Sequence, residues 1–290
     1  MCPYNRFTLL IMKTVKTIGE LKLYLRAQRA KGHTVGFVPT MGALHKGHMD
    51  LMRIAREQND VVVVSIFVNP TQFNNPNDLR NYPRTLEQDL SKCEHVKVDI
   101  VFTPSIEEVY PETDTRKFDF GILDQVMEGK HRPGHFNGVA QVVSRLFDAV
   151  EPDRAYFGQK DYQQLAIIRK LVQILSLDIE IVACPTVRED DGLAMSSRNM
   201  LLTPEQRNSA PLISETLFAA QNKKSQMNVN QMKSWVIDQI NSNPLLNVEY
   251  FEIADAQTLE AIGQWSDAPI AVGCIAVQVG EVRLIDNILF

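Results

Sequence analysis

The sequence predicts an α/β protein with a doubly wound parallel sheet and a smaller C-terminal α+β domain. Between residues 12 and 187, short apolar runs alternate with amphipathic helical segments, which is the pattern of repeated βαβ units. The run at 61–68 is nearly all apolar and β-branched, as expected for a central strand covered on both faces. After about residue 187 the pattern changes, so we expect a Rossmann-like domain at 12–187 and a second domain at 188–290.

The expected elements follow from periodicity and from the positions of glycine and proline. In the first domain we expect strands at 35–38, 61–68, 98–102, 154–157 and 179–183, and helices at 17–31, 47–58, 83–95, 138–150 and 161–175. In the second we expect helices at 204–224 and 229–241 and strands at 248–253, 270–279 and 282–285. Doubly wound sheets bind ligands at the carboxyl ends of their strands, so the site is expected there.

Composition limits the possible functions. The chain has 290 residues, of which 44% are hydrophobic and 22% charged, as in a globular protein. A net charge of −5 gives no basic field that would recruit nucleic acid, and no apolar run reaches the length of a membrane span. Four cysteines, Cys2, Cys93, Cys184 and Cys274, lie far apart, which argues against zinc or a disulfide scaffold and fits reduced thiols in the cytoplasm.

The first eleven residues form a leader ahead of the first helix. They contain one basic residue, Arg6, and are too short for a secretory signal. Met12 is an equally good start, so we expect residues 1–11 to be a disordered or artificial extension.

The segment at 34–48 carries the clearest chemical signal. It opens as a short apolar strand and passes through a turn containing Gly42 and Gly47 before a helical pattern begins. Backbone amides at a helix start can bind an anion such as phosphate. His45 and His48 are three residues apart and so face the same side of a first helical turn, where two imidazole donors suit charge developing on phosphorus. The alternatives are surface histidines on an ordinary turn, or a metal pair, for which no third ligand is evident nearby.

Polar residues also follow the run at 61–68. The stretch at 69–73 includes Gln72, whose amide can recognise hydroxyl and carboxylate groups of a small substrate, although a simple polar turn is the alternative. Asp89 is a single carboxylate that is ordinarily solvated, and it becomes a metal ligand only if ATP brings Mg²⁺.

Two further junctions carry charged and hydroxyl side chains. At a second strand-to-helix junction, Lys160 is placed to meet phosphate oxygens and Asp161 a ribose hydroxyl; the alternative is a surface lysine. In the polar loop at 188–199, Ser196, Ser197 and Arg198 offer two hydroxyls and a guanidinium, which would suit a triphosphate.

These segments, in this order, resemble known motifs. The strand, turn and His-x-Gly-His resemble the HIGH-type motif of the nucleotidylyltransferase superfamily, which class I aminoacyl-tRNA synthetases share, and the Ser-Ser-Arg segment is similar to the mobile KMSKS-type loop. The whole set resembles the pantothenate synthetase (pantoate–β-alanine ligase) family. The matching stretches are 38–48, 67–73, 82–84, 132–136, 156–164, 191–199 and 283–287, and the clearest departure from the family pattern is the leader before Met12.

The resemblance implies ATP-dependent condensation of pantoate with β-alanine to pantothenate, through a pantoyl adenylate, with release of AMP and pyrophosphate. It implies catalytic roles for His48, His45, Lys160, Ser196, Ser197 and Arg198. It implies ATP binding by Met41, Gly42, Ala43, Leu44, His45, Lys46, Gly47, His48, Gly158, Gln159, Lys160, Asp161, Val187, Met195, Ser196, Ser197 and Arg198. It further implies pantoate binding by Gln72 and Gln164, with Gln72 also near β-alanine, Mg²⁺ contact by Asp89, and a cytoplasmic homodimer.

Three other functions compete with this interpretation. A different nucleotidylyltransferase would join a nucleotide to a phosphorylated acceptor and make no acyl adenylate. A tRNA-charging or tRNA-modifying enzyme is disfavoured, because the chain has no anticodon-type module and no excess of basic residues. A non-catalytic nucleotide sensor would not need the complete set of histidine, lysine and Ser-Ser-Arg residues.

Overall fold

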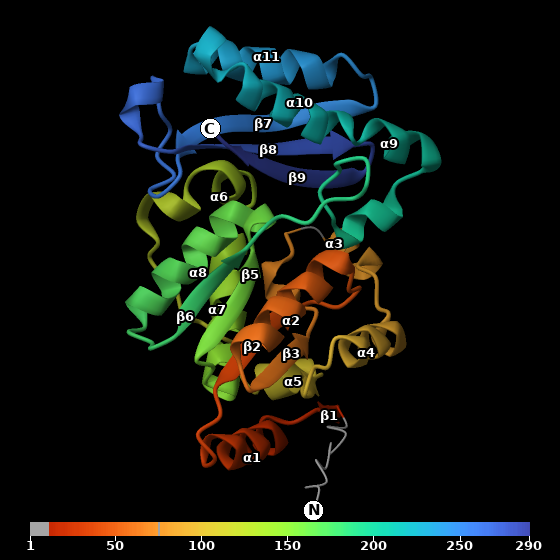
Figure 1. Ribbon diagram of the computed structural model, residues 1–290, viewed down its shortest axis with the longest axis vertical. Coiled ribbons are helices and arrows are strands. Elements are labelled where there is room, and N and C mark those ends of the chain that lie inside the picture. Colours follow the sequence, from red (N-terminus) through yellow and green to blue (C-terminus); the bar gives the residue numbers. More distant parts are fainter. Residues whose placement is uncertain (1–11, 75) are drawn as a thin grey trace, which may run out of the picture.

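The computed structural model describes residues 12–74 and 76–290, so the leader predicted at 1–11 lies outside the described residues. Six strands form a parallel sheet in the order β1-β4-β3-β2-β5-β6, and three form an antiparallel sheet in the order β7-β8-β9 (Figure 1). The strands are β1 (Lys13–Val15), β2 (Val35–Thr40), β3 (Val61–Ile66), β4 (Ile100–Phe102), β5 (Arg154–Gly158), β6 (Glu180–Cys184), β7 (Leu246–Asp255), β8 (Ala271–Val279) and β9 (Val282–Leu289). The predicted fold class is thus confirmed.

The helices cover both faces of the large sheet and the outer face of the small one (Figure 1). They are α1 (Ile18–Arg29), α2 (Lys46–Gln58), α3 (Pro76–Asn81), α4 (Leu86–His95), α5 (Ile106–Val109), α6 (Met127–His131), α7 (His135–Val150), α8 (Tyr162–Ile174), α9 (Pro204–Ser209), α10 (Leu212–Asn222) and α11 (Val229–Asn241). No helix in the described part of the chain combines the length and apolar character that crossing a membrane requires.

Alternating side chains along the central strands build two separate cores. Phe37 of β2 and Val63 of β3 pack in the cluster that contains Phe147 of α7. Their neighbours in the sequence point the other way, and Val38 packs in the cluster that contains Met52 of α2. Successive side chains of a strand point to opposite faces of the sheet, and here both faces are buried. The strands therefore appear in the sequence as continuous apolar runs.

The order of the strands creates a crevice between β2 and β5. These strands are paired neighbours, but the chain leaves β2 toward β3 on one side and returns much later to β5 on the other. At such a switch point the connections diverge above the carboxyl ends of the two strands and leave room for a ligand. The His-x-Gly-His segment follows β2, and the segment with Lys160 follows β5.

The structure differs from the expected elements in several places: the helix expected at 83–95 begins at Leu86, the one expected at 138–150 begins at His135, and the short helices α3, α5 and α6 were not predicted. Two further differences have a local cause. The helix expected at 204–224 is divided into α9 and α10, because Pro211 has no amide hydrogen to continue the helical ladder. Strand β1 was not predicted, since two of its three residues are exposed and it carries no apolar pattern; it adds to the edge of the sheet by pairing with β4.

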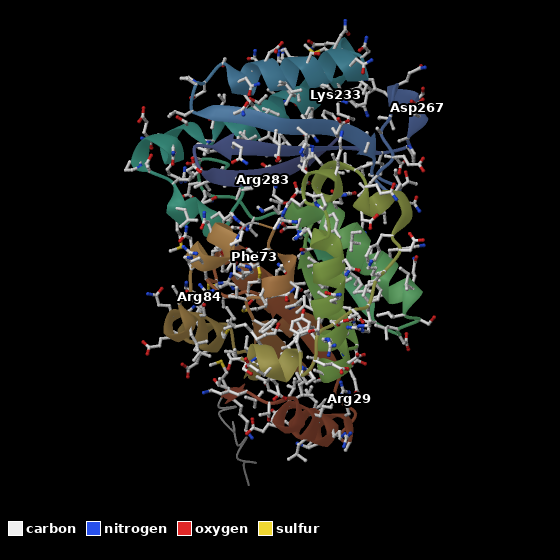
Figure 2. The ribbon with its side chains drawn as sticks, turned by 180° about the vertical axis from the view of Figure 1, so that it is seen from behind. Arg29, Phe73, Arg84, Lys233, Asp267 and Arg283 are labelled. Carbon is white, nitrogen blue, oxygen red and sulfur yellow. The ribbon has the colours of Figure 1, made fainter. Side chains whose placement is uncertain are left out.

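The small sheet lies between its helices and the N-terminal domain, our name for residues 12–187. Val272 and Cys274 of β8 pack against Met127 of α6 across this boundary. An ionic contact accompanies them: the guanidinium of Arg283 donates two hydrogen bonds, of 2.9 and 2.6 Å, to the carboxylate of Glu128. Figure 2 shows Arg283 on the side of the small sheet that faces the N-terminal domain.

Candidate active site

One cavity lies above the carboxyl ends of the central strands. It is lined by most of the residues that the sequence singled out: Met41, His45, Gly47, His48, Gln72, Gly158, Lys160, Asp161, Gln164, Val187, Met195, Ser196, Ser197 and Arg198. Of the remaining residues predicted to bind ATP, none lines the cavity: Gly42, Ala43 and Leu44 are buried, Gln159 is half-buried and Lys46 is exposed. Segments far apart in the sequence therefore meet around a single cavity.

The two histidines lie against each other at the start of α2. His45 precedes the helix as its N-cap, so only His48 belongs to the first turn, and the ring centroids are 4.1 Å apart. The amide of His45 donates to Nδ1 of His48 at 3.3 Å. Because Nδ1 accepts, the proton of a neutral His48 ring sits on Nε2, which makes Nε2 a hydrogen-bond donor.

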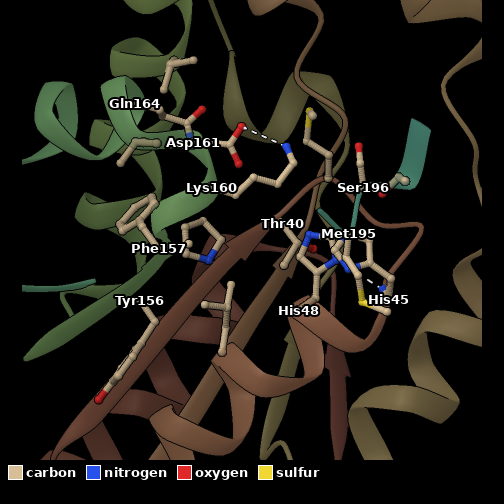
Figure 3. Close-up of a pocket in the computed structure, with 18 of the residues that line it drawn as sticks. Thr40, His45, His48, Tyr156, Phe157, Lys160, Asp161, Gln164, Met195 and Ser196 are labelled. Carbon is tan, nitrogen blue, oxygen red and sulfur yellow. Dashed lines mark hydrogen bonds and ion pairs between the residues drawn. The ribbon is translucent and has the colours of Figure 1, made fainter. Parts of the chain in front are cut away.

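Both histidines are neutral at pH 7. Burial, followed by the charge of Lys160, lowers the pKa of His45 to about 4. Burial and the adjacent His45 ring hold the pKa of His48 well below its ordinary value. The rings can therefore donate hydrogen bonds without carrying charge, and Lys160 supplies the positive charge. Figure 3 shows Lys160 reaching into the cavity from one side and the imidazoles from another.

The turn before the histidines is bound by Asp89. The amides of Ala43 and Leu44 donate to the two carboxylate oxygens of Asp89 at 2.9 and 2.8 Å, and the hydroxyl of Thr85 donates to the same carboxylate at 3.1 Å. The resemblance implies ATP contact by Ala43 and Leu44, but an internal carboxylate already accepts from their amides. Ala43 has a φ of 49°, a left-handed conformation that costs an ordinary residue roughly 1–2 kcal/mol, which these charge-assisted bonds offset.

This geometry does not fit the predicted magnesium role of Asp89. The side chain is fully buried, does not line the cavity, and directs both oxygens at the turn. Within 12–74 and 76–290, no cluster of three or more histidine, cysteine or acidic side chains could hold a metal ion. The sequence could not reveal this, because it shows a carboxylate near the site but not which groups the carboxylate faces.

Gln72 is held from several directions. Asn69 Nδ2 donates to its side-chain oxygen at 3.1 Å, and His135 Nδ1 donates to its backbone oxygen at 2.8 Å. Arg132 donates to the other nitrogen of the His135 ring at 3.1 Å, which fixes the tautomer. His135 thus supports the site without lining it, a role that the sequence did not predict because the contact joins segments 63 residues apart.

The cavity also has an apolar wall. Val139, Val142 and Val143 of α7 line it together with Phe67, which follows β3. In the sequence these valines look like ordinary buried positions of an amphipathic helix, and nothing distinguishes them from core. Only the pairing of α7 with the segment 70–72 brings them to a ligand surface.

The loop with the Ser-Ser-Arg segment lies over the histidine turn. Ser197 Oγ donates to the backbone oxygen of Ala43 at 3.0 Å. Arg198 forms an ion pair of 2.8 Å with Asp78, and its guanidinium lies over the ring of Tyr82. At the segment that follows β5, Asn287 of β9 donates to the backbone oxygens of Gln159 and Lys160, both at 2.9 Å. The C-terminal domain, our name for residues 188–290, therefore contacts both the histidine turn and the segment with Lys160.

Comparisons with known proteins agree over both domains. A profile of the pantoate-beta-alanine ligase family matches residues 13–289. The pantothenate synthetases of Porphyromonas gingivalis and Phocaeicola vulgatus are 53% and 56% identical, each over 96% of this chain and 99% of the relative. The crystal structure of pantothenate synthetase from Thermus thermophilus is similar with a TM-score of 0.89 at 44% identity, covering 96% of this chain and 99% of that one. Pantoate-beta-alanine ligase from Francisella tularensis, complexed with beta-gamma ATP and beta-alanine, gives 0.81 at 36% identity, covering 96% and 98%.

Proposed function

The chain belongs to the pantoate–β-alanine ligase family, and from that premise we propose that its cavity makes pantothenate in two steps through a pantoyl adenylate. It is a ligase that forms an amide bond, and ATP is a substrate. The observation that carries the proposed route is the convergence of two neutral imidazoles and Lys160 on one cavity whose other wall is apolar and amide-bearing. That arrangement supports attack by a carboxylate at a phosphate.

In the first step, a carboxylate oxygen of pantoate attacks the α-phosphorus of ATP. The new P–O bond forms as the bond to the β-phosphate oxygen breaks, and pyrophosphate leaves. His48 donates from Nε2 to the crowded phosphate, and Lys160 offsets the negative charge that accumulates there. No protein nucleophile is needed, so the enzyme contributes position and electrostatic stabilisation.

In the second step, the neutral amine of β-alanine attacks the acyl carbon of the adenylate. The C–N bond forms, the C–O bond to the phosphate breaks, the nitrogen loses a proton, and AMP leaves. The Francisella tularensis ligase forms a complex with beta-alanine alongside beta-gamma ATP, which supports the same pair of substrates here.

Pantoate carries two methyl groups, two hydroxyls and a carboxylate. We assign its polar groups to the amides of Gln72 and Gln164, and its methyl groups to the wall formed by Val139, Val142 and Val143. Asn69 and His135 hold Gln72 in place, so the amide is fixed before the substrate arrives.

Three further features stay proposals. Mg²⁺ enters with the triphosphate, on phosphate oxygens; the buried and occupied Asp89 is not assigned to it, and no step depends on a bond between metal and protein. The homodimer rests on the resemblance, and light scattering would test it. A cytoplasmic location rests on the same resemblance.

Isotope exchange tests the adenylate route. Labelled pyrophosphate is expected to enter ATP when pantoate and Mg²⁺ are present and β-alanine is absent, because the first step is reversible. Oxygen-18 in the carboxylate of pantoate is expected to end in the phosphate of AMP. Amide product without transfer of the oxygen label would exclude the adenylate, and exchange that requires a phosphorylated acceptor in place of pantoate would favour another nucleotidylyltransferase.

A further inference from the structure

The turn that carries the two histidines is held from beneath by one face of α4. Asp89 and Lys92 are three residues apart, so they project from the same side of this helix, and Thr85 precedes it as the N-cap. Asp89 accepts from the amides of Ala43 and Leu44, while Lys92 Nζ donates to the backbone oxygen of Leu44 at 2.6 Å. The helix therefore binds both donors and acceptors of the turn.

The bound segment is the part of the chain that places the catalytic groups. Leu44 directly precedes His45, whose amide fixes the ring of His48. The backbone oxygen of Ala43 accepts from Ser197 of the covering loop. A shift of this turn would therefore move the imidazoles and the contact point of the loop together.

Space around the turn is also restricted. Gly42 has a φ of 82°, and a Cβ at this position would lie 3.1 Å from Ile66 and 3.2 Å from the Asp89 carboxylate. Two successive left-handed residues present the amides of Ala43 and Leu44 to one carboxylate, a concave arrangement that favours an anion. Asp89 supplies that anion from inside the protein.

We propose that Asp89, supported by Thr85, is a positioning residue for adenylate formation: it fixes the 42–44 turn so that His48 Nε2 meets the α-phosphate. This inference rests on the proposed function. It replaces the magnesium role with a different one for the same carboxylate, and the two roles make different predictions.

The variant Asp89→Asn removes the charge with little change in volume. The amides of Ala43 and Leu44 donate to different oxygens of Asp89, and asparagine places an NH2 donor at one of these two positions, so one backbone amide would face a donor in place of its acceptor. We expect the rate constant of pantoate-dependent pyrophosphate exchange to fall about 10–100-fold, the cost of a small misplacement of a reacting group. The Mg²⁺ concentration that gives half-maximal rate is expected to stay unchanged. A raised Mg²⁺ requirement, with activity restored by excess Mg²⁺, would overturn the proposal.

Matched variants separate positioning from general damage to α4. Glu87→Gln removes an exposed carboxylate from the same helix and is expected to behave like the wild type. Thr85→Val removes only the hydroxyl that supports Asp89 and is expected to give a smaller loss of the same kind. If Asp89→Asn does not fold, Thr85→Val decides, and a wild-type exchange rate in that variant would overturn the proposal.

A double-mutant cycle tests whether Asp89 acts through His48. If it does, adding Asp89→Asn to His48→Ala changes the exchange rate little, because the group being positioned is already absent. If the reductions in exchange rate of the two single variants multiply in the double variant, Asp89 acts independently of His48, and the proposal is overturned. Exchange by the wild-type enzyme is measured first, so failure of the adenylate route is recognised separately from failure of the positioning role.

Discussion

At the scale of single residues, different side chains of the cavity supply the hydrogen-bond donor and the positive charge. His45 and His48 are half-buried, and their ring centroids are 4.1 Å apart. Burial, followed by the charge of Lys160, lowers the pKa of His45, and burial, followed by the adjacent His45 ring, lowers the pKa of His48. A neutral ring with a fixed tautomer donates in one direction only, because Nδ1 of His48 is already engaged. The site therefore presents an oriented donor at His48 and a positive charge at Lys160.

Removal of the imidazole of His48 tests its assigned role. We expect His48→Ala to lower the rate of pantoate-dependent pyrophosphate exchange by about 10²–10³, as for other preorganised donors to a transition state. His48→Gln retains an amide donor and is expected to recover part of the rate. His95→Ala changes an exposed histidine of α4 and serves as the control. Equal activity of His48→Ala and the control would remove His48 from the chemistry.

His135 makes stability depend on pH. Burial, followed by the charge of Arg132, lowers its pKa to about 4, against 6.5 in an exposed histidine. Between these values the unfolded chain binds a proton that the folded chain does not, so this contribution is complete above pH 6.5 and falls as the pH drops toward 4.

We compare urea unfolding of the wild type and His135→Asn at pH 7 and pH 5. The asparagine amide can replace Nδ1 as the donor to Gln72 without titrating. Acidification is expected to destabilise the wild type by about 2 kcal/mol more than the variant. Other titrating groups are common to both proteins, so equal losses would show that His135 titrates normally.

At the scale of elements, the sequence predicted what depends on local pattern. Helix α11 matches its expected bounds, and each expected strand contains or overlaps an observed one, because burial on both faces leaves long apolar runs. Motif residues such as His48 and Lys160 were found because they follow β2 and β5. The sequence did not predict the partners of Asp89 or the valine wall of α7, because both depend on which elements pack together.

The contact between α7 and the segment 70–72 illustrates this dependence. A Cβ added at Gly138 would lie 2.5 Å from the backbone oxygen of Thr71 and 3.0 Å from the Cα of Gln72. The glycine lets the helix approach the backbone closely, and its own oxygen accepts from Asn69 at 3.1 Å. Any side chain here would separate the apolar wall from the glutamine that it faces.

We expect Gly138→Ala to raise the KM for pantoate more than the KM for ATP and to destabilise the fold by about 1–3 kcal/mol, as overpacking does. Gly19→Ala is the matched control, since a Cβ on Gly19 of α1 meets nothing within 4 Å. That variant is expected to gain up to about 1 kcal/mol from helix propensity without changing either KM. Steady-state kinetics and urea unfolding measure both effects, and equal KM values in the two variants would refute the assigned contact.

At the scale of the whole molecule, the C-terminal domain is coupled to the site through buried polar contacts. Arg188 and Asp286 form two hydrogen bonds of 2.6 and 3.0 Å within this domain, and the neighbouring Asn287 reaches the backbone of Lys160. Across the boundary, burial acts to raise the pKa of Glu128, but the hydrogen bonds and charge of Arg283, together with the Tyr250 hydroxyl and the charge of Arg132, outweigh it and lower the pKa to about 2. The sequence gives no sign of this pair, whose members are 155 residues apart.

Loss of Arg283 would leave Glu128 buried with weaker partners. Arg132 lies 3.5 Å from its carboxylate, and the hydroxyl of Tyr250 donates to it at 2.8 Å. We expect Arg283→Met to destabilise the protein by about 3 kcal/mol, since breaking a buried pair leaves an uncompensated charge. Lys233→Met is the control, because Lys233 pairs with Glu252 on the outer side of the same domain (Figure 2), where such pairs contribute about 0–1 kcal/mol.

Two causes could lower the stability of Arg283→Met: the uncompensated charge of Glu128 and the lost packing of the Arg283 side chain. A second substitution distinguishes them. If the uncompensated buried charge of Glu128 is the cause, adding Glu128→Gln to Arg283→Met restores stability, because a neutral amide costs less free energy to bury than a carboxylate. If lost packing is the cause, the second substitution adds a further loss. Thermal unfolding of the two single variants and the double variant distinguishes these outcomes. Stability of the double variant above that of Arg283→Met would establish that the charge of Glu128 requires Arg283 at the domain boundary.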